Sequence, residues 1–186
     1  MSFLASKSQL RASFVRWALF FVPLILLLGF VSGEIGGSDT PWFQNLRKPD
    51  IFPPPALFGI AWSVLFVLIG LALAFVASAW GARGRVLALA VFALHFAATL
   101  AWTPVFFAMK EMETALYILV FVVISLLAVV VLFWRVRRIA AALLLPYLAW
   151  VTFAAVLNYQ FILVNPGAGP GTEDALDDGA AVRVTL

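Results

Sequence analysis

Five long apolar stretches make up most of the chain, and short polar or proline-rich connections separate them. None of the five contains Asp, Glu, Lys or Arg; they cover residues 17–33, 51–82, 86–109, 114–134 and 139–165. A helix that crosses a bilayer needs about 20 mainly apolar residues, and its backbone groups must be satisfied within the segment. The pattern therefore predicts an all-α integral membrane protein, a five-transmembrane-helix bundle with helices near 14–33, 55–80, 86–109, 114–135 and 139–164.

The composition supports this class and excludes several others. Of 186 residues, 65% are hydrophobic and 11% charged, whereas soluble domains are about half apolar and a quarter charged. The chain has no cysteine and one histidine, His95, so disulfides, cysteine nucleophiles and zinc sites with several Cys or His ligands are excluded. No carboxylate falls within an apolar stretch, so a proton relay or a Ser-His-Asp triad cannot form there. We expect no catalytic residue, no metal site and no obligatory cofactor.

The distribution of charged residues separates a membrane domain from a C-terminal tail and predicts the orientation of the chain in the membrane. Residues 1–165 form one expected membrane domain, and the Gly-, Pro- and acid-rich tail 166–186 is expected to be disordered. Eight of the twelve Lys and Arg residues fall in the N-terminal segment and the second and fourth connections. In a bacterial inner membrane this bias predicts a cytoplasmic N-terminus and an external C-terminus. No basic stripe suggests a nucleic-acid partner.

The first apolar stretch has an alternative interpretation as a secretory signal peptide. Lys7, Arg11 and Arg16 precede it, as basic residues precede the apolar region of such a signal. The stretch is somewhat long for that role, and Val31-Ser32-Gly33 is a poor cleavage site. We expect it to remain as a helix.

The connection over residues 34–54 is the one long loop. It contains Pro41, Pro49 and the run Pro53-Pro54-Pro55, which favour a stiff and extended backbone. The sequence predicts an ordered lid here rather than a flexible linker.

Polar and aromatic residues recur at helical spacing in three of the predicted helices. At 100° per residue, four side chains of the third helix fall within about 60° of one another. These stripes are His95, Thr99, Trp102 and Phe106; Tyr147, Trp150, Ala154 and Asn158; and Phe58 with Trp62. Polar groups avoid lipid, so the stripes point inward and describe an aromatic pocket. Alternatively, the aromatic residues pack the bundle, and His95 and Asn158 bridge helices.

Prolines occupy three of the predicted helices, at positions 23, 104 and 146. Each removes one backbone hydrogen bond and kinks or loosens its helix. A kink can open space for a ligand between helices, although membrane helices also tolerate proline without such a role.

Three separate sequence motifs occur in order along the chain. The first leads from the lid into the second helix, the second lies in the third helix and the third in the fifth. They are Trp42-Phe43-Gln-Asn-Leu46-Arg-Lys48-Pro49 with Pro53-Pro54, Phe58, Trp62 and Gly70; Ala101-Trp102-Thr-Pro-Val-Phe106-Phe107; and Pro146-Tyr147-Leu148-Ala-Trp150-Val-Thr-Phe153-Ala154-Ala-Val-Leu157-Asn158, closed by Asn165. Together these motifs resemble those of the TspO/translocator family of tryptophan-rich sensory proteins. The resemblance runs from about residue 17 to residue 165.

The resemblance implies a five-helix protein of the lipid bilayer, often dimeric, with a ligand pocket beneath the first loop. It implies a membrane-embedded sensory or regulatory protein that binds tetrapyrroles, with porphyrin or haem as possible ligands. Light-dependent porphyrin breakdown, or carriage of porphyrins or similar lipophilic ligands, are the alternatives. The implied ligand contacts are Trp42, Phe58, Trp62, Thr99, Trp102, Phe106, Tyr147, Trp150, Ala154 and Asn158.

The chain departs from the family pattern at several positions. Ile51 replaces a tryptophan, Phe66 replaces a tyrosine, and His95 and Thr99 replace Gln and Asn. His95 is expected either to bridge helices or to make a polar contact with a ligand carboxylate or haem iron. The sterol-recognition pattern is missing, because no Lys or Arg follows Tyr159.

Small residues recur every four positions on the third helix, at Ala93, Ala97 and Ala101. At 100° per residue their face centres about 170° from the aromatic stripe. Small faces allow the close backbone approach that drives helix association in lipid. We therefore expect a homodimer through this face, with packing against another helix of the same chain as the alternative.

Overall fold

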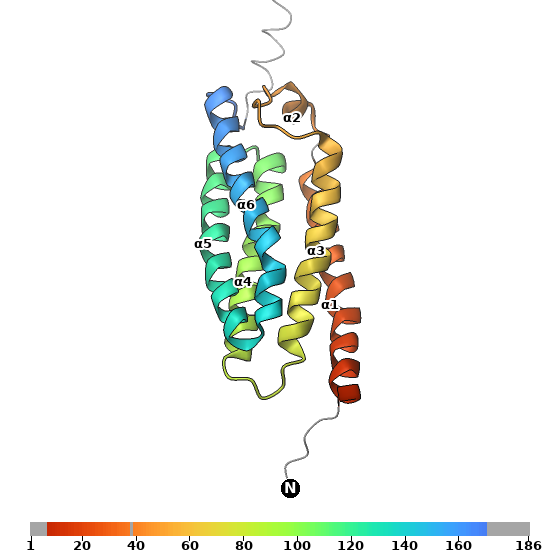
Figure 1. Cartoon of the computed structure of the whole chain (residues 1–186). Helices are drawn as coiled ribbons and strands as arrows, with labels where there is room; N and C mark the ends of the chain where they lie inside the picture. Colours follow the sequence, from red (N-terminus) through yellow and green to blue (C-terminus); the bar gives the residue numbers. More distant parts are fainter. Residues whose placement is uncertain (1–6, 38, 171–186) are drawn as a thin grey trace, which may run out of the picture.

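The computed structural model describes residues 7–37 and 39–170, and its elements within those ranges are all helical. In chain order they are α1 (Lys7–Gly36), α2 (Pro41–Asn45), α3 (Pro55–Ala77), α4 (Arg85–Thr103), the π-helical turn η1 (Pro104–Ala108), α5 (Met112–Val136) and α6 (Arg138–Val164). Five of the helices, with η1 continuing α4, are long and apolar enough to cross a membrane. The prediction of an all-α five-helix membrane bundle is confirmed (Figure 1).

The five long helices run roughly along one axis (Figure 1). α5 packs most extensively against α6 and α4, while α1 packs on α3, which in turn contacts α6. Gly70 permits the close approach of α1 and α3, since a Cβ there would lie 2.7 Å from the Cα of Val22. In lipid, such small residues let two helix backbones come into van der Waals contact.

The predicted helix boundaries agree with the structure to within a few residues, except in α1. That helix begins at Lys7 rather than near residue 14. Pro23 and Pro146 remain inside α1 and α6 without ending them. Pro104 does alter the backbone, because α4 passes into a π-helical turn at that residue and the N–H of Met109 bonds the Pro104 carbonyl at 2.9 Å. Such turns are often found at functional sites.

Two groups of connections lie at opposite ends of the bundle. The start of α1 and the loops after α3 and α5 share one end, and the 34–54 loop, the turn before α5 and the end of α6 share the other (Figure 1). At the first end Trp80 and Trp134 are exposed, with guanidinium groups of Arg85 and Arg138 over their rings at 4.1 and 5.5 Å. Aromatic and basic residues commonly mark a membrane interface in this way. Of the predicted tail, residues 171–186 lie outside the described residues.

Candidate functional site

The 34–54 loop contains a short helix whose two ends are both capped. Thr40 begins α2 by accepting a hydrogen bond from the Phe43 N–H at 3.3 Å, and Pro41 takes the first helical position, where no N–H is needed. Trp42 and Leu46 are buried beneath it, at 1% and 5% exposure. The segment is thus an ordered cover anchored by its own apolar side chains; we call residues 39–54 the lid.

Lys48 closes the other end of α2. Its ammonium donates to the carbonyls of Phe43, Gln44 and Leu46, the last at 3.1 Å, and lies 4.1 Å from the centre of the Phe43 ring. A cation at a helix C-terminus interacts favourably with the free carbonyls there. Partial burial lowers the pKa of Lys48 from its ordinary value, because the charged form loses solvation.

One side chain ties the lid to the end of α6. Asn165 accepts a hydrogen bond from the Arg47 N–H at 2.7 Å and donates to the Arg47 carbonyl at 2.9 Å, across 118 residues of sequence. A second donor bond, 3.0 Å to the Phe161 carbonyl, fixes the orientation of the Asn165 amide on its own helix. The lid is therefore held to the bundle by backbone recognition as well as by apolar packing.

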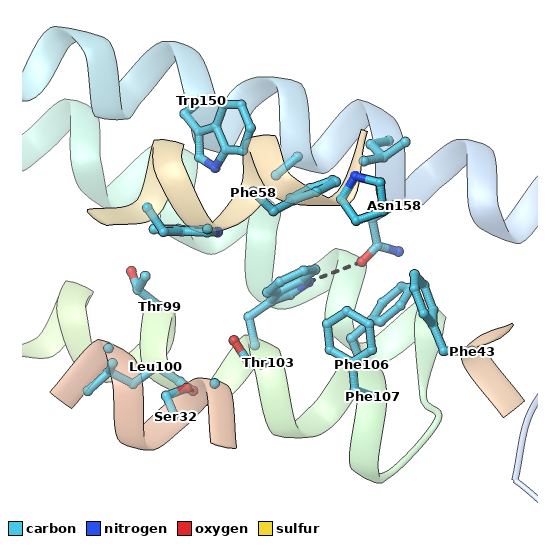
Figure 2. A pocket seen from close by; sticks show the side chains of 18 of the residues that line it. Ser32, Phe43, Phe58, Thr99, Leu100, Thr103, Phe106, Phe107, Trp150 and Asn158 are labelled. Atoms are coloured by element: carbon cyan, nitrogen blue, oxygen red, sulfur yellow. Dashed lines mark hydrogen bonds between the residues drawn. The ribbon is translucent and has the colours of Figure 1, made fainter. Parts of the chain in front are cut away.

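Beneath the lid lies a cavity of about 830 Å³, walled by the lid together with α1, α3, α4, η1 and α6. Aromatic rings dominate its wall, and Figure 2 shows Phe58 and Trp150 converging with Phe106 and Phe107 from separate helices. The aromatic wall residues are Phe30, Phe43, Phe52, Phe58, Trp62, Phe66, Trp102, Phe106, Phe107, Trp150 and Phe161. Volumes of roughly 300–1,000 Å³ with mainly apolar walls are typical of small-molecule sites.

Eight of the eleven residues expected to contact a ligand lie in the cavity wall. They are Phe58, Trp62, Thr99, Trp102, Phe106, Trp150, Ala154 and Asn158. Trp102 and Asn158 hold each other in place, since the indole N–H donates to the Asn158 Oδ1 at 3.1 Å (Figure 2). The Asn158 amide in turn donates to the Met112 carbonyl at 2.9 Å. Asn158 thus bridges α4 and α5 as well as facing the cavity.

The other three, His95, Tyr147 and Trp42, lie outside the cavity wall. His95 and Tyr147 are fully buried below its floor and bond each other, with Nε2 3.2 Å from the tyrosine hydroxyl. His95 Nδ1 lies 2.9 Å from the Ser125 hydroxyl, and Thr99 lies 2.8 Å from the Tyr147 hydroxyl. The structure therefore gives His95 the helix-bridging role. Trp42 packs under the lid with its ring 6.0 Å from that of Phe106.

The sequence predicted a pocket beneath the first loop and next to the first helix, but it named no residue of α1 and only Trp42 of the lid as contacts. Ser32 and Glu34 of α1 and Asp39, Gln44 and Lys48 of the lid all line it. α1 carried no polar stripe that could have revealed its inward face, and Ser32 uses its hydroxyl to bond the Leu100 carbonyl at 2.7 Å. The loop charges were visible in the sequence, but only the fold of the lid brings them to the cavity.

The alanine face of α4 is directed away from the cavity. Ala93, Ala97 and Ala101 are all exposed in the single chain. They therefore do not pack against another helix in the part of the chain that the structure describes, and the face remains open to lipid or to a second copy.

Comparison with known proteins supports the family resemblance of the sequence motifs over most of the chain. The model of the TspO/MBR family matches residues 21–164. A protein named tryptophan-rich sensory protein from Cereibacter sphaeroides is 39% identical over 150 residues, which cover 80% of this chain and 92% of that protein. Protein CrtK of Rhodobacter capsulatus is 36% identical over 144 residues, covering 76% and 90% of the two chains. The translocator protein of Sus scrofa is 34% identical over 146 residues, covering 77% and 86%.

Proposed function

The chain belongs to the TspO/MBR family, and from that premise we propose that it binds a flat lipophilic ligand of the tetrapyrrole class in the cavity under the lid. The role we propose is sensory or regulatory, as the name of the Cereibacter sphaeroides relative suggests for that protein. The observation that carries the proposal is one cavity of about 830 Å³ that combines aromatic walls from five helical elements with a lid hydrogen-bonded to the end of α6. Flat apolar rings gain both burial and stacking in such a site.

The wall chemistry supports this ligand class over a polar metabolite. Several polar side chains of the wall are engaged within the protein: Ser32 donates to the Leu100 carbonyl, Ser63 to the Gly59 carbonyl, and Trp102 to Asn158. A strongly polar ligand would lose its hydration and gain few hydrogen bonds in return. A flat ring system with one polar edge at the lid would avoid that loss.

The experiment is identification of the natural ligand. The protein would be purified from its host in mild detergent, and any retained pigment identified by absorbance and mass spectrometry. A bound tetrapyrrole, lost in a variant with a filled cavity such as Ala154→Leu, is the expected result. A different class of retained molecule, or a pigment retained equally by the variant, would contradict the proposal.

A light-dependent activity is the second candidate, because three oxidisable indoles, those of Trp62, Trp102 and Trp150, line the same cavity. An excited porphyrin held against them would have electron donors within contact distance. Loss of porphyrin absorbance under light, faster in the parent than in Trp150→Phe, would favour breakdown. Equal rates, with binding intact, would leave the sensory role.

Two further proposals concern assembly and orientation. We propose a homodimer through the alanine face of α4, supported by its exposure and small side chains. We also propose that the N-terminus is cytoplasmic in a bacterial inner membrane, supported by the basic residues at that end of the bundle.

A further inference from the structure

We infer that the cavity selects its ligand by charge: it accepts flat ligands whose polar edge is neutral or basic, and it disfavours ligands that carry two carboxylates there. The inference rests on the proposed function, since it concerns the same cavity. It adds a class of ligand and the two residues, Glu34 and Asp39, that set the preference.

The charged residues of the cavity wall, among those described, are Glu34, Asp39 and Lys48. Glu34 lies near the end of α1 and Asp39 at the start of the lid, and both side chains are exposed at the mouth of the cavity. Neither carboxylate makes a hydrogen bond or an ion pair with the part of the chain that the structure describes. Both carboxylates therefore face solvent and any ligand edge that lies in the mouth.

Lys48 does not offset the two carboxylates as a binding group. An ammonium has three N–H donors, and Lys48 has three carbonyl partners, those of Phe43, Gln44 and Leu46. A ligand carboxylate could recruit this ammonium only by uncapping α2 and so loosening the lid. Arg47, the residue before Lys48, does not line the cavity, and its backbone N–H and carbonyl are hydrogen-bonded to Asn165.

The donors that remain available inside the cavity are neutral. The indole N–H groups of Trp62 and Trp150 make no hydrogen bond within the described chain, and both residues line the cavity, as does Thr103 (Figure 2 shows Trp150 and Thr103). Neutral donors suit a carbonyl, ester or ether oxygen. They can donate a hydrogen bond to a carboxylate, but unlike Arg or Lys they bring no opposing charge and no bidentate fork.

The expected size of the effect follows from Coulomb's law. Repulsion between two like unit charges about 10 Å apart in water weakens binding by roughly twofold at low salt, and a ligand with two carboxylates meets two on the protein. The four pairwise repulsions together correspond to about a tenfold loss of affinity. Because these charges are exposed, salt should screen most of that loss, with a Debye length of about 30 Å at 0.01 M and 3 Å at 1 M.

The test uses three probes that differ in charge: protoporphyrin as the free diacid, its dimethyl ester, and a bis-amide derivative with two basic amines. Each is titrated by tryptophan quenching against the full chain in phosphatidylcholine nanodiscs. The variants are the double substitution Glu34→Gln with Asp39→Asn and, as a control, Asp50→Asn, which removes an exposed lid carboxylate outside the cavity wall. Comparing variant with parent for each probe cancels differences in probe partition into lipid.

In the double variant we expect the diacid to bind about tenfold more tightly, the ester within twofold of the parent, and the amine several-fold more weakly. In the parent, 1 M salt should strengthen diacid binding several-fold, and this dependence should vanish in the double variant but not in Asp50→Asn. If the double variant leaves all three affinities unchanged while the probes bind, the charge inference is overturned and the proposed function stands. If none of the probes binds the parent, the proposed function fails and the inference fails with it.

Discussion

The side chain of Asn165 is hydrogen-bonded to both the backbone N–H and the backbone carbonyl of Arg47, so one residue at the end of α6 helps to hold the lid in place. The pairing resembles one rung of a β-ladder, but the partner is an amide side chain rather than a strand. It recognises backbone and therefore does not depend on the Arg47 side chain. The rigidity of the lid therefore depends in part on one residue outside it, in addition to the apolar packing of Trp42 and Leu46.

The first prediction concerns this clamp. Asn165→Ala removes both hydrogen bonds to Arg47, which are worth about 0.5–1.5 kcal/mol each. Amide exchange across the lid should accelerate by about tenfold or more, and ligand dissociation should become several-fold faster. Asn45→Ala, in the exposed last residue of α2, is the matched control and should leave both rates unchanged. Lid exchange as slow in Asn165→Ala as in the control would show that apolar packing alone holds the lid.

The second prediction separates stability from binding at His95. His95→Leu leaves the Tyr147 and Ser125 hydroxyls each short of one partner, so it should lower the thermal midpoint in detergent, by a free energy of about 1–3 kcal/mol. His95→Gln should restore part of that loss because an amide can still donate and accept. Ligand affinity should stay within twofold in both variants, and the spectrum of any bound haem should not change in His95→Gln. A haem spectrum that lost an axial nitrogen ligand would contradict the position of His95 below the floor.

The third prediction concerns the contact between α1 and α3. Gly70→Ala would place a Cβ 2.7 Å from the Val22 backbone, so α1 must shift, at a cost of about 1–3 kcal/mol. Gly59→Ala, on the same helix, meets no atom within 4 Å and should be neutral or stabilising by up to about 1 kcal/mol. The thermal midpoint in detergent should therefore fall in Gly70→Ala and stay the same or rise in Gly59→Ala. A Gly70 variant as stable as the Gly59 variant would mean that the two helices do not approach as closely as described.

The fourth prediction tests the proposed homodimer. Ala97→Phe places a bulky ring in the middle of the exposed alanine face of α4, which should block close helix contact. The mass of the protein assembly, measured in mild detergent, should shift from that of a dimer to that of a monomer. Ala142→Phe, at an exposed alanine of α6, serves as the control and should behave as the parent. A variant that stays as dimeric as the parent would exclude this face as the interface.

The helices could be predicted from sequence because the bilayer imposes a length and a composition that the five stretches meet. The cavity could be predicted only in part, because periodicity gives the angle of a residue around a helix and not its depth. Tyr147 and Ala154 are seven residues apart and share a face, but they differ by roughly 10 Å along the axis. Ala154 reaches the cavity, while Tyr147 lies below its floor with His95.

An ordered lid was predicted, but its position over the cavity could not be derived from sequence, for a different reason. Its prolines indicated stiffness, but its position depends on contacts with distant residues, such as that of Arg47 with Asn165. The charges of Glu34 and Asp39 were equally visible in the sequence, and only the closed loop brings them to the mouth of the cavity.

The measurement that tests the account most directly is the affinity of protoporphyrin dimethyl ester for Ala154→Leu, compared with Ala149→Leu. Ala154 lines the cavity at 9% exposure, whereas Ala149, on the same helix, is exposed and outside the wall. The added leucine atoms should occupy space that the ring needs, so tryptophan quenching should show binding at least tenfold weaker in Ala154→Leu and unchanged in Ala149→Leu. Equal affinity in the two variants would contradict the claim that this cavity is the ligand site.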